Sequence, residues 1–380
     1  FLLYIYYLLR TTFKSGFSIS KICYVIKHIK NRHQIFDEFD CQIRPLYHHL
    51  DKLKMLAFRL SFISGYIYIE KMVKQLKLGE DDVVILWGCE NSGPHLLIQH
   101  LNKLGVKYFV SEYGEIPGTF SLNKDGIFGD SDIARNWSQI HSRNADSNST
   151  NIAENYLHKL ESTQLSSRDN SIVDQSLSFY KQVFRPQKTL KKNIYVSGVE
   201  LIASGHLFNK DFVRPGVSNA NEMLLKHVLL HFDLEKYTIF YKDHPIMQEN
   251  YPELTLDESD FKGVVFVNFM NVDNLITIAD LTITLPSKVI MTCLMYRKPV
   301  YCYGDFSIPT SVPALGFYTG QDVADVKSVV DSDDNIINAS SYPELVSKLF
   351  QEGLIQYDAE LFESLDSAAQ QNKIIKIINS

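Results

Sequence analysis

The sequence predicts an α/β protein built from two Rossmann-like domains that face a cleft, with extra helices at the N-terminus. Three observations predict this class. The chain has 380 residues, enough for about two domains of ordinary size. Short apolar, β-branched runs alternate with amphipathic segments on both sides of a polar stretch, a pattern typical of parallel sheets covered by helices. Residues 20–78 carry apolar positions three or four apart with few breakers, which indicates helices ahead of the first strand.

Composition excludes several classes of protein. Hydrophobic residues make up 45% of the chain and charged residues 22%, which argues against a disordered chain and against a polytopic membrane protein. The net charge of −6 argues against a nucleic-acid scaffold, although a local basic site for one phosphate is compatible with it. The five cysteines are scattered without a CxxC pair, which is typical of reduced thiols in a cytoplasmic protein.

The first nine residues are apolar and are followed by Arg10. Such a segment cannot span about 30 Å of hydrocarbon, which requires about 20 residues. A truncated signal segment or membrane anchor is one interpretation. The favoured one is a buried helix or strand in a chain whose first residues are missing.

The first α/β pattern begins at residues 82–88, an apolar run that ends in glycine and predicts a buried parallel strand. An amphipathic helix is expected over 95–104 and a second strand over 106–110, which together make one βαβ unit. Residues 111–132 then form a loop-rich stretch. Ligands in open α/β sheets bind beyond the carboxyl ends of strands, so function is expected in this loop.

A second α/β pattern follows a helix expected over 152–160 and a polar linker near 172–190. We therefore place the domains at 1–185 and 186–380, and we expect the C-terminal helices to pack back near the first domain. The expected strands are 193–198, 237–242, 264–267, 281–284 and 299–303. The expected helices are 220–232, 272–278, 287–296, 342–350 and 359–378.

A carboxylate follows the second strand of the first domain, in the segment Glu112-Tyr113-Gly114. Pro117 and Gly118 bend the chain directly afterwards. A carboxylate held at a strand end can act as a general base or stabilise a positively charged centre. An ordinary acidic turn is the alternative interpretation.

Two motifs in the second domain are suited to binding a phosphate. Lys242-Asp243-His244-Pro245 follows a strand, and its imidazole and ammonium groups can donate hydrogen bonds to an anion. Ser287 follows another strand at the expected start of a helix, where a hydroxyl and backbone N–H groups favour an anion. The alternatives are a histidine satisfied by backbone groups and a serine that only caps its helix.

The sequence carries no recognised metal-binding pattern. Two Asp-Ser-Asp triplets, at 130–132 and 331–333, are explained by solvated loop acids, and the 12 histidines are scattered. We expect no metal site.

These motifs in this order resemble bacterial CMP-sugar glycosyltransferases, above all the capsule-polysaccharide biosynthesis group that includes the β-Kdo transferases. The residues that carry the resemblance are IYVSG at 194–198, IFYKDHP at 239–245 and TITLPSKVIMTCLMYRKPVYCYG at 282–304. The resemblance extends over roughly residues 82–305. The first 80 residues and about the last 70 show no recognisable motif.

The resemblance implies a GT-B glycosyltransferase that moves a CMP-activated ulosonic acid, Kdo or a sialic-acid-like sugar, to a glycan or lipid-linked glycan of the bacterial surface, in capsule or lipopolysaccharide. It implies no metal or other cofactor and no nucleic-acid partner. The implied location is the cytoplasm, with peripheral association with the inner membrane or an assembly complex left open. The first domain then holds the acceptor and the catalytic acid, and the second holds the nucleotide.

The resemblance also implies roles for individual residues. Glu112 matches the acidic residue of an acid-acid-Gly motif, with Tyr113 in place of the second acid. His244 and Ser287 match residues that hold the CMP phosphate, and Lys242 falls on the lysine two residues before the histidine. The expected binding residues are completed by the neighbours of these motifs, Gly114, Gly198 and Pro245.

Other positions depart from the group and leave alternatives open. Thr292-Cys293 stands where the group usually has Glu-Ala. A retaining enzyme needs a second carboxylate, for which Glu200 is the positional candidate and Asp211 its competitor. The alternative functions are a glycosyltransferase that uses a UDP- or GDP-sugar, and an inactive sugar- or nucleotide-binding module of a polysaccharide assembly complex.

Overall fold

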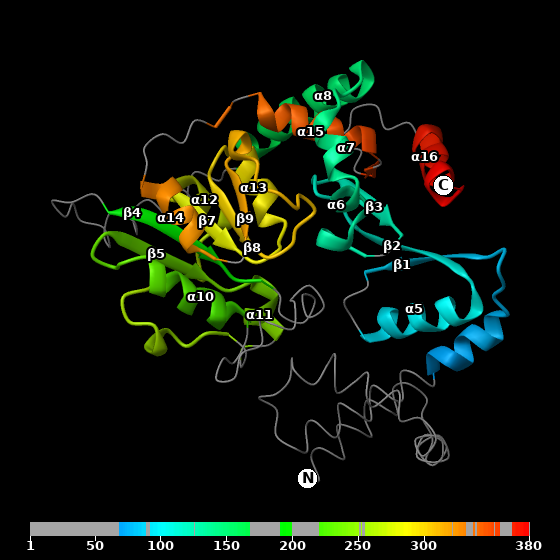
Figure 1. Ribbon diagram of the computed structural model, residues 1–380, viewed down its shortest axis with the longest axis horizontal. Coiled ribbons are helices and arrows are strands. Elements are labelled where there is room, and N and C mark those ends of the chain that lie inside the picture. The colour runs from blue at the N-terminus through cyan, green and yellow to red at the C-terminus, as the bar shows by residue number, and fades with distance from the viewer. Residues whose placement is uncertain are drawn as a thin grey trace, which may run out of the picture. The chain divides into compact units, whose positions relative to one another are not determined.

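The computed structural model describes the chain in segments (Figure 1), and these are residues 68–88, 92–124, 126–167, 191–199, 220–250, 252, 255–320, 322–331, 337–338, 340–352, 354–357 and 367–379. The chain divides into two compact units, Phe1–Val84 with Cys89–Tyr108, and Ile85–Gly88 with Phe109–Ser380. The domain boundary expected between residues 185 and 186 lies outside the described residues and stays a prediction. The same holds for the helices expected over 20–67.

The second unit contains a six-stranded sheet in the order β6-β5-β4-β7-β8-β9, with every neighbouring pair parallel. The strands are β4 (Lys192–Ser197), β5 (Tyr237–Lys242), β6 (Val265–Phe266), β7 (Leu281–Thr284), β8 (Val300–Tyr303) and β9 (Phe317–Gly320). Numbered along the chain, this is the doubly wound order 3-2-1-4-5-6. The expected α/β class with a Rossmann-like sheet is therefore confirmed.

Both faces of this sheet are buried against helices. Alternate residues of a strand point to opposite faces, so Ile194 and Val196 lie in one core cluster and Tyr195 in another. The first cluster includes α10 (Ala220–His231) and α14 (Ala324–Asp331). The second includes α12 (Val272–Ile278) and α13 (Val289–Met295). Burial on both faces explains why apolar, β-branched and aromatic residues predominate in these strands, the pattern by which the sequence predicts them.

A four-stranded sheet has the order β1-β2-β3-β10, formed by β1 (Val83–Trp87), β2 (Lys107–Tyr113), β3 (Thr119–Asn123) and β10 (Ile355–Gln356). β3 pairs antiparallel with both β2 and β10. The prediction of a loop-rich stretch over 111–132 is therefore wrong, because β2 extends to Tyr113 and β3 pairs beside it. The turn between them is closed by the Gly114 N–H, which donates to the Thr119 carbonyl at 2.8 Å.

The C-terminal segment returns to the first half of the second unit. α15 (Ser341–Glu352) packs against α7 (Trp137–Ser142) and α8 (Ser147–Ser167), and α16 (Ser367–Asn379) packs against β10. Because β10 pairs with β3, the expectation that C-terminal elements pack back toward the N-terminal half is confirmed.

The remaining elements connect these layers. They are α5 (Ser92–Leu104), α6 (Asp132–Arg135), α11 (Pro245–Asn250), the 3₁₀ turns η3 (Phe128–Asp130), η6 (Glu258–Asp260) and η7 (Pro313–Leu315), and a helix over 68–76. Among the helices that the structure describes, none combines the length and the apolar character needed to cross a bilayer.

Candidate active site

The sequence motifs of the second domain meet at one edge of the six-stranded sheet. Parallel strands end at the same edge, so the topology brings Gly198 after β4, His244 after β5 and Ser287 after β7 to the carboxyl side. The strand order reverses between β4 and β7, and this switch point is the favoured ligand position of open α/β sheets. Gly198 and Ser287 follow these two strands.

His244 has a defined hydrogen-bonding state. Its Nδ1 accepts a hydrogen bond from the Ile246 N–H at 3.3 Å, so the neutral ring carries its proton on Nε2. Burial lowers the pKa of His244, and the charge of Lys242 lowers it further, which keeps the ring neutral at pH 7. His244 therefore offers one Nε2–H donor. Pro245 follows it as the first residue of α11.

Lys242 and Asp243 are held by the segment after β6. The Lys242 ammonium donates to the Asn268 carbonyl, and burial lowers the pKa of Lys242. The Asp243 carboxylate accepts from the Tyr241 hydroxyl at 2.7 Å, and the Asp243 backbone N–H donates to the Asn268 side-chain oxygen at 2.8 Å. These bonds fix the loop that presents His244. Sequence reasoning assigns no role to Asp243.

Gly198 allows β4 and β5 to end close together. Its N–H donates to the Lys242 carbonyl at 2.8 Å. A Cβ on Gly198 would lie 2.9 Å from that same oxygen and 2.9 Å from the Tyr241 hydroxyl. Backbone cannot yield as a flexible side chain does, so only glycine fits at this position.

Ser287 lies two residues before α13, which begins at Val289 and not at Ser287 as expected. The Ser287 hydroxyl accepts from the Val289 N–H at 3.4 Å. A hydroxyl that accepts one bond still has its own proton to donate. The neighbouring residue, Lys288, reaches toward β2.

Glu112 and Ser287 are connected through Lys288. The Lys288 ammonium lies 3.4 Å from Glu112 Oε1 and also donates to the Tyr113 carbonyl. Glu112 Oε1 accepts from the Tyr113 N–H at 2.9 Å. The expected catalytic carboxylate therefore lies in contact with the residue next to the expected phosphate ligand. The sequence analysis missed Lys288, although it directly follows Ser287.

Glu115 is a second carboxylate in the β2–β3 turn, and sequence reasoning missed it. It is 8% exposed, and its Oε1 accepts from the Ser307 hydroxyl at 2.6 Å. Its Oε2 has no hydrogen-bond partner among the described residues. Burial raises the pKa of Glu115, and the bond from Ser307 only partly offsets this. A buried acid without a full set of partners is a common feature of functional sites. The sequence signal that could have identified Glu115 is its place as the second acidic residue of the segment EYGE, residues 112–115.

The raised pKa of Glu115 makes stability depend on pH. The folded state holds a proton that the unfolded state has already lost, so the free energy of unfolding falls as pH rises above about 4.5, the ordinary value, through the folded pKa. Glu115→Gln removes this titration and keeps an acceptor for Ser307. Urea unfolding at pH 5 and pH 8 should show a smaller loss of stability in the variant than in the wild-type protein. Equal losses would contradict the assignment.

Three aromatic side chains form a cluster around Tyr113, the residue that follows Glu112. Trp87 and Tyr113 pack edge to face with ring centroids 4.9 Å apart, and Tyr357 lies 6.5 Å from Tyr113. The Lys288 ammonium lies 5.4 Å from the centre of the Tyr113 ring. All three rings remain about half exposed, at 56% for Trp87, 54% for Tyr113 and 48% for Tyr357. We call these three residues the aromatic platform.

The remaining predicted positions are Glu200, Asp211 and Gly114. Glu200 and Asp211 fall outside the described residues, so both stay predictions. Gly114 lies in the β2–β3 turn, where a Cβ would clash with the Thr119 hydroxyl. Cys293 is fully buried in the core on α13, and burial raises its pKa to about 12. Cys293 is therefore a packing residue and not a nucleotide ligand.

Comparison with known proteins returns structures only, since no protein-family model and no curated protein matches the chain. The chain is similar to the β-Kdo 2,7 transferase of Thermosulfurimonas dismutans KpsC, with 20% identity over 77% of this chain and 86% of that chain and a TM-score of 0.44. The β-Kdo 2,4 transferase of the same protein shows 14% identity over 70% and 78%, with a TM-score of 0.45.

An enzyme of another activity is also similar. The UDP-GlcNAc 2-epimerase of Methanocaldococcus jannaschii, in complex with UDP-GlcNAc and UDP, shows 11% identity over 77% of this chain and 81% of that chain, with a TM-score of 0.39. The matches thus include β-Kdo transferases, the kind of enzyme that the sequence motifs resemble, and an enzyme that binds a UDP-sugar.

Proposed function

We propose that this protein is a glycosyltransferase that moves a CMP-activated ulosonic acid, Kdo or a sialic-acid-like sugar, to a glycan acceptor of the bacterial surface. One observation carries the proposal: Lys288 joins Glu112, on β2, to the carboxyl edge of the six-stranded sheet, where His244 and Ser287 lie. Donors that hold the leaving phosphate and a carboxylate that accepts a proton can together catalyse glycosyl transfer from a nucleotide-sugar.

The phosphate side of the site consists of neutral donors. His244 offers Nε2–H and Ser287 offers its hydroxyl, both at the switch-point edge. Hydrogen bonds to a phosphate stabilise the charge that develops when CMP leaves. The proposed transfer uses no metal, as the resemblance implies.

The transfer step assigns a role to Glu112. The bond between the anomeric carbon and the phosphate oxygen breaks, and CMP leaves with the electron pair. The acceptor oxygen forms the new bond to that carbon, and its proton passes to the Glu112 carboxylate. Lys288 orients Glu112 through the ion pair and holds the end of β2 through the Tyr113 carbonyl.

The acceptor side is assigned to the aromatic platform. The half-exposed aromatic rings next to Glu112 are inclined to one another, by 84° between Trp87 and Tyr113, so they give an apolar surface on which a sugar ring can stack against one ring at a time. Tyr113 belongs to this platform and stands where the resembled group has its second acid. The substitution therefore replaces a charge with a stacking surface, at the residue next to Glu112.

A donor screen tests the proposal. The purified protein is incubated with CMP-Kdo, CMP-sialic acids, UDP-GlcNAc and a GDP-sugar, and release of free nucleotide is measured. We expect release from a CMP-ulosonic acid and stabilisation against heat by CMP but not by UDP or GDP. Release only from a UDP- or GDP-sugar would replace the donor class. Binding of CMP without release or transfer from any donor would indicate an inactive binding module instead.

A further inference from the structure

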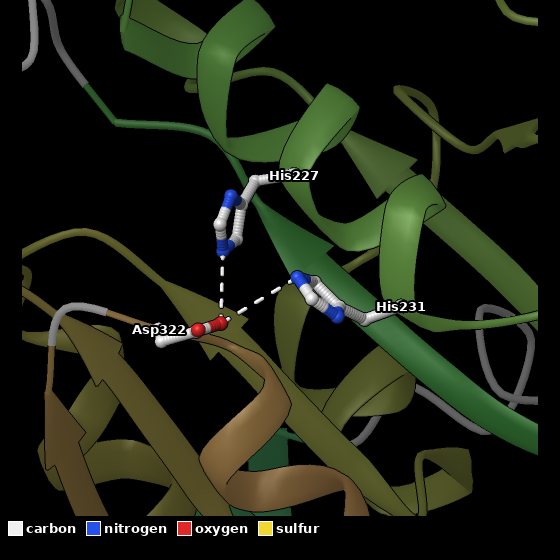
Figure 2. Close-up of side chains that lie close together, drawn as sticks. All are labelled: His227, His231 and Asp322. Atoms are coloured by element: carbon white, nitrogen blue, oxygen red, sulfur yellow. Dashed lines mark hydrogen bonds and ion pairs between the residues drawn. The ribbon is translucent and has the colours of Figure 1, made fainter.

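Two histidines and an aspartate meet on the face of the six-stranded sheet that α10 covers. His227 and His231 lie one turn apart on α10, and Figure 2 shows both rings directed at the carboxylate of Asp322. Asp322 follows β9 and precedes α14. We propose that these three residues bind a divalent transition-metal ion of the zinc class, at a site that takes no part in the transfer proposed above.

The distances fit tetrahedral coordination. Asp322 Oδ1 lies 3.3 Å from His227 Nε2 and 3.5 Å from His231 Nε2. Zinc bonds of about 2.0–2.2 Å at tetrahedral angles place neighbouring ligand atoms about 3.3–3.6 Å apart. The ligand atoms of all three residues lie within 4.8 Å of one another. His227 Nε2 also accepts a hydrogen bond from the Val323 N–H at 3.4 Å, so metal binding requires that this bond give way and that the imidazole rings rotate.

The ligands are held in place by their surroundings. The Ala324 N–H donates to Asp322 Oδ1 at 2.9 Å, and the Tyr301 hydroxyl donates to the Asp322 carbonyl at 2.8 Å. The His227 ring packs against Tyr303, with ring centroids 5.3 Å apart. Bonds of this kind, which orient the ligands themselves, raise metal affinity.

The ligand set selects the metal class. Two imidazoles and one carboxylate suit zinc and related first-row ions, whereas magnesium and calcium prefer oxygen ligands alone. Three protein ligands leave a fourth position for water. The ion would join α10 to the start of α14, two elements that cover the same face of the sheet. We therefore expect a stabilising role for the ion.

The sequence alone could not identify this site. His227 and His231 have the i,i+4 spacing of helical metal ligands, but two such histidines are common without a metal. The third ligand lies 95 residues after His227 and is brought there by the position of β9 in the sheet.

Calorimetric titration with ZnCl2 and with MgCl2 tests the proposal. The metal-free protein should bind one zinc ion and no magnesium at the same concentrations, and zinc should raise its unfolding midpoint. His231→Gln and Asp322→Asn should each weaken zinc binding by at least about tenfold. Loss of a group that only orients a ligand already lowers metal affinity by about 10- to 100-fold, and loss of the ligand itself should lower it at least as much. The asparagine of the second variant keeps an acceptor for the Ala324 N–H, so the start of α14 is preserved.

His158→Gln is the matched control, since His158 is exposed on α8, outside the cluster. It should bind zinc as the wild-type protein does. Zinc binding that is absent from the wild-type protein, or unchanged in both cluster variants, would overturn the proposal. If a variant fails to fold, the visible spectrum of the wild-type protein with Co²⁺ decides: intense tetrahedral bands support the site, and the weak bands of an octahedral aquo ion contradict it.

Discussion

Replacing Glu112 by glutamine is expected to lower turnover by a factor of about 10² or more and to leave CMP affinity unchanged. Glutamine has nearly the same shape but cannot take the proton of the acceptor hydroxyl. Its side-chain oxygen still accepts from the Tyr113 N–H, which the structure places 2.9 Å from Glu112 Oε1. The proposed nucleotide contacts, from His244 and Ser287, should remain intact. A transfer assay beside calorimetry with CMP measures both quantities.

Glu235→Gln is the control for this variant. Glu235 is an exposed acid two residues before β5, at the amino edge of the six-stranded sheet and so opposite the carboxyl edge. Its replacement should change neither turnover nor CMP affinity. If Glu112→Gln loses CMP affinity as strongly as a His244 variant does, the assignment of Glu112 to the transferred sugar is wrong.

Replacing His244 by alanine is expected to weaken CMP binding by about 1.5–3 kcal/mol, the contribution of a hydrogen bond to a charged group. This corresponds to a loss of roughly 10- to 150-fold in affinity. The cause is the loss of the Nε2–H donor, which the bond from the Ile246 N–H to Nδ1 defines. Calorimetric titration with CMP at pH 7 measures the change.

His244→Asn separates the phosphate contact from a local structural effect. An asparagine oxygen can accept from the N–H two residues ahead, as Asn271 does from Asp273 at 2.7 Å. The variant should therefore keep the start of α11 and lose CMP affinity as His244→Ala does. His158→Ala, an exposed histidine on α8, should bind CMP normally. Full CMP affinity in His244→Asn would mean that His244 acts only as a cap.

The buried strands could be predicted from the sequence because both of their faces are covered. β4, β5, β7 and β8 are rich in apolar, β-branched and aromatic residues, and the predicted ends of each lie within two residues of the observed ones. β3, β9 and β10 were missed for a physical reason. They are short and mix polar with apolar residues, and their stability comes from neighbours far along the chain, as when β10 pairs with β3.

The candidate site could be predicted only where a motif sits at a strand end. His244 and Ser287 follow single strands, and topology alone brings them to one edge. Lys288 and Glu115 depend on contacts across the fold, with Glu112 and Ser307 respectively. No local pattern encodes a pair that lies more than 170 residues apart, such as Lys288 with Glu112. Side-chain partners of this kind require the structure.

A crystal structure with bound CMP tests the central claim most directly. The claim predicts the nucleotide at the carboxyl edge of the six-stranded sheet, at the switch point between β4 and β7. Its phosphate should lie within hydrogen-bond distance of His244 Nε2 and the Ser287 hydroxyl, with Glu112 facing the position of the transferred sugar. CMP bound away from this edge, or bound there without contact to either residue, would contradict the account.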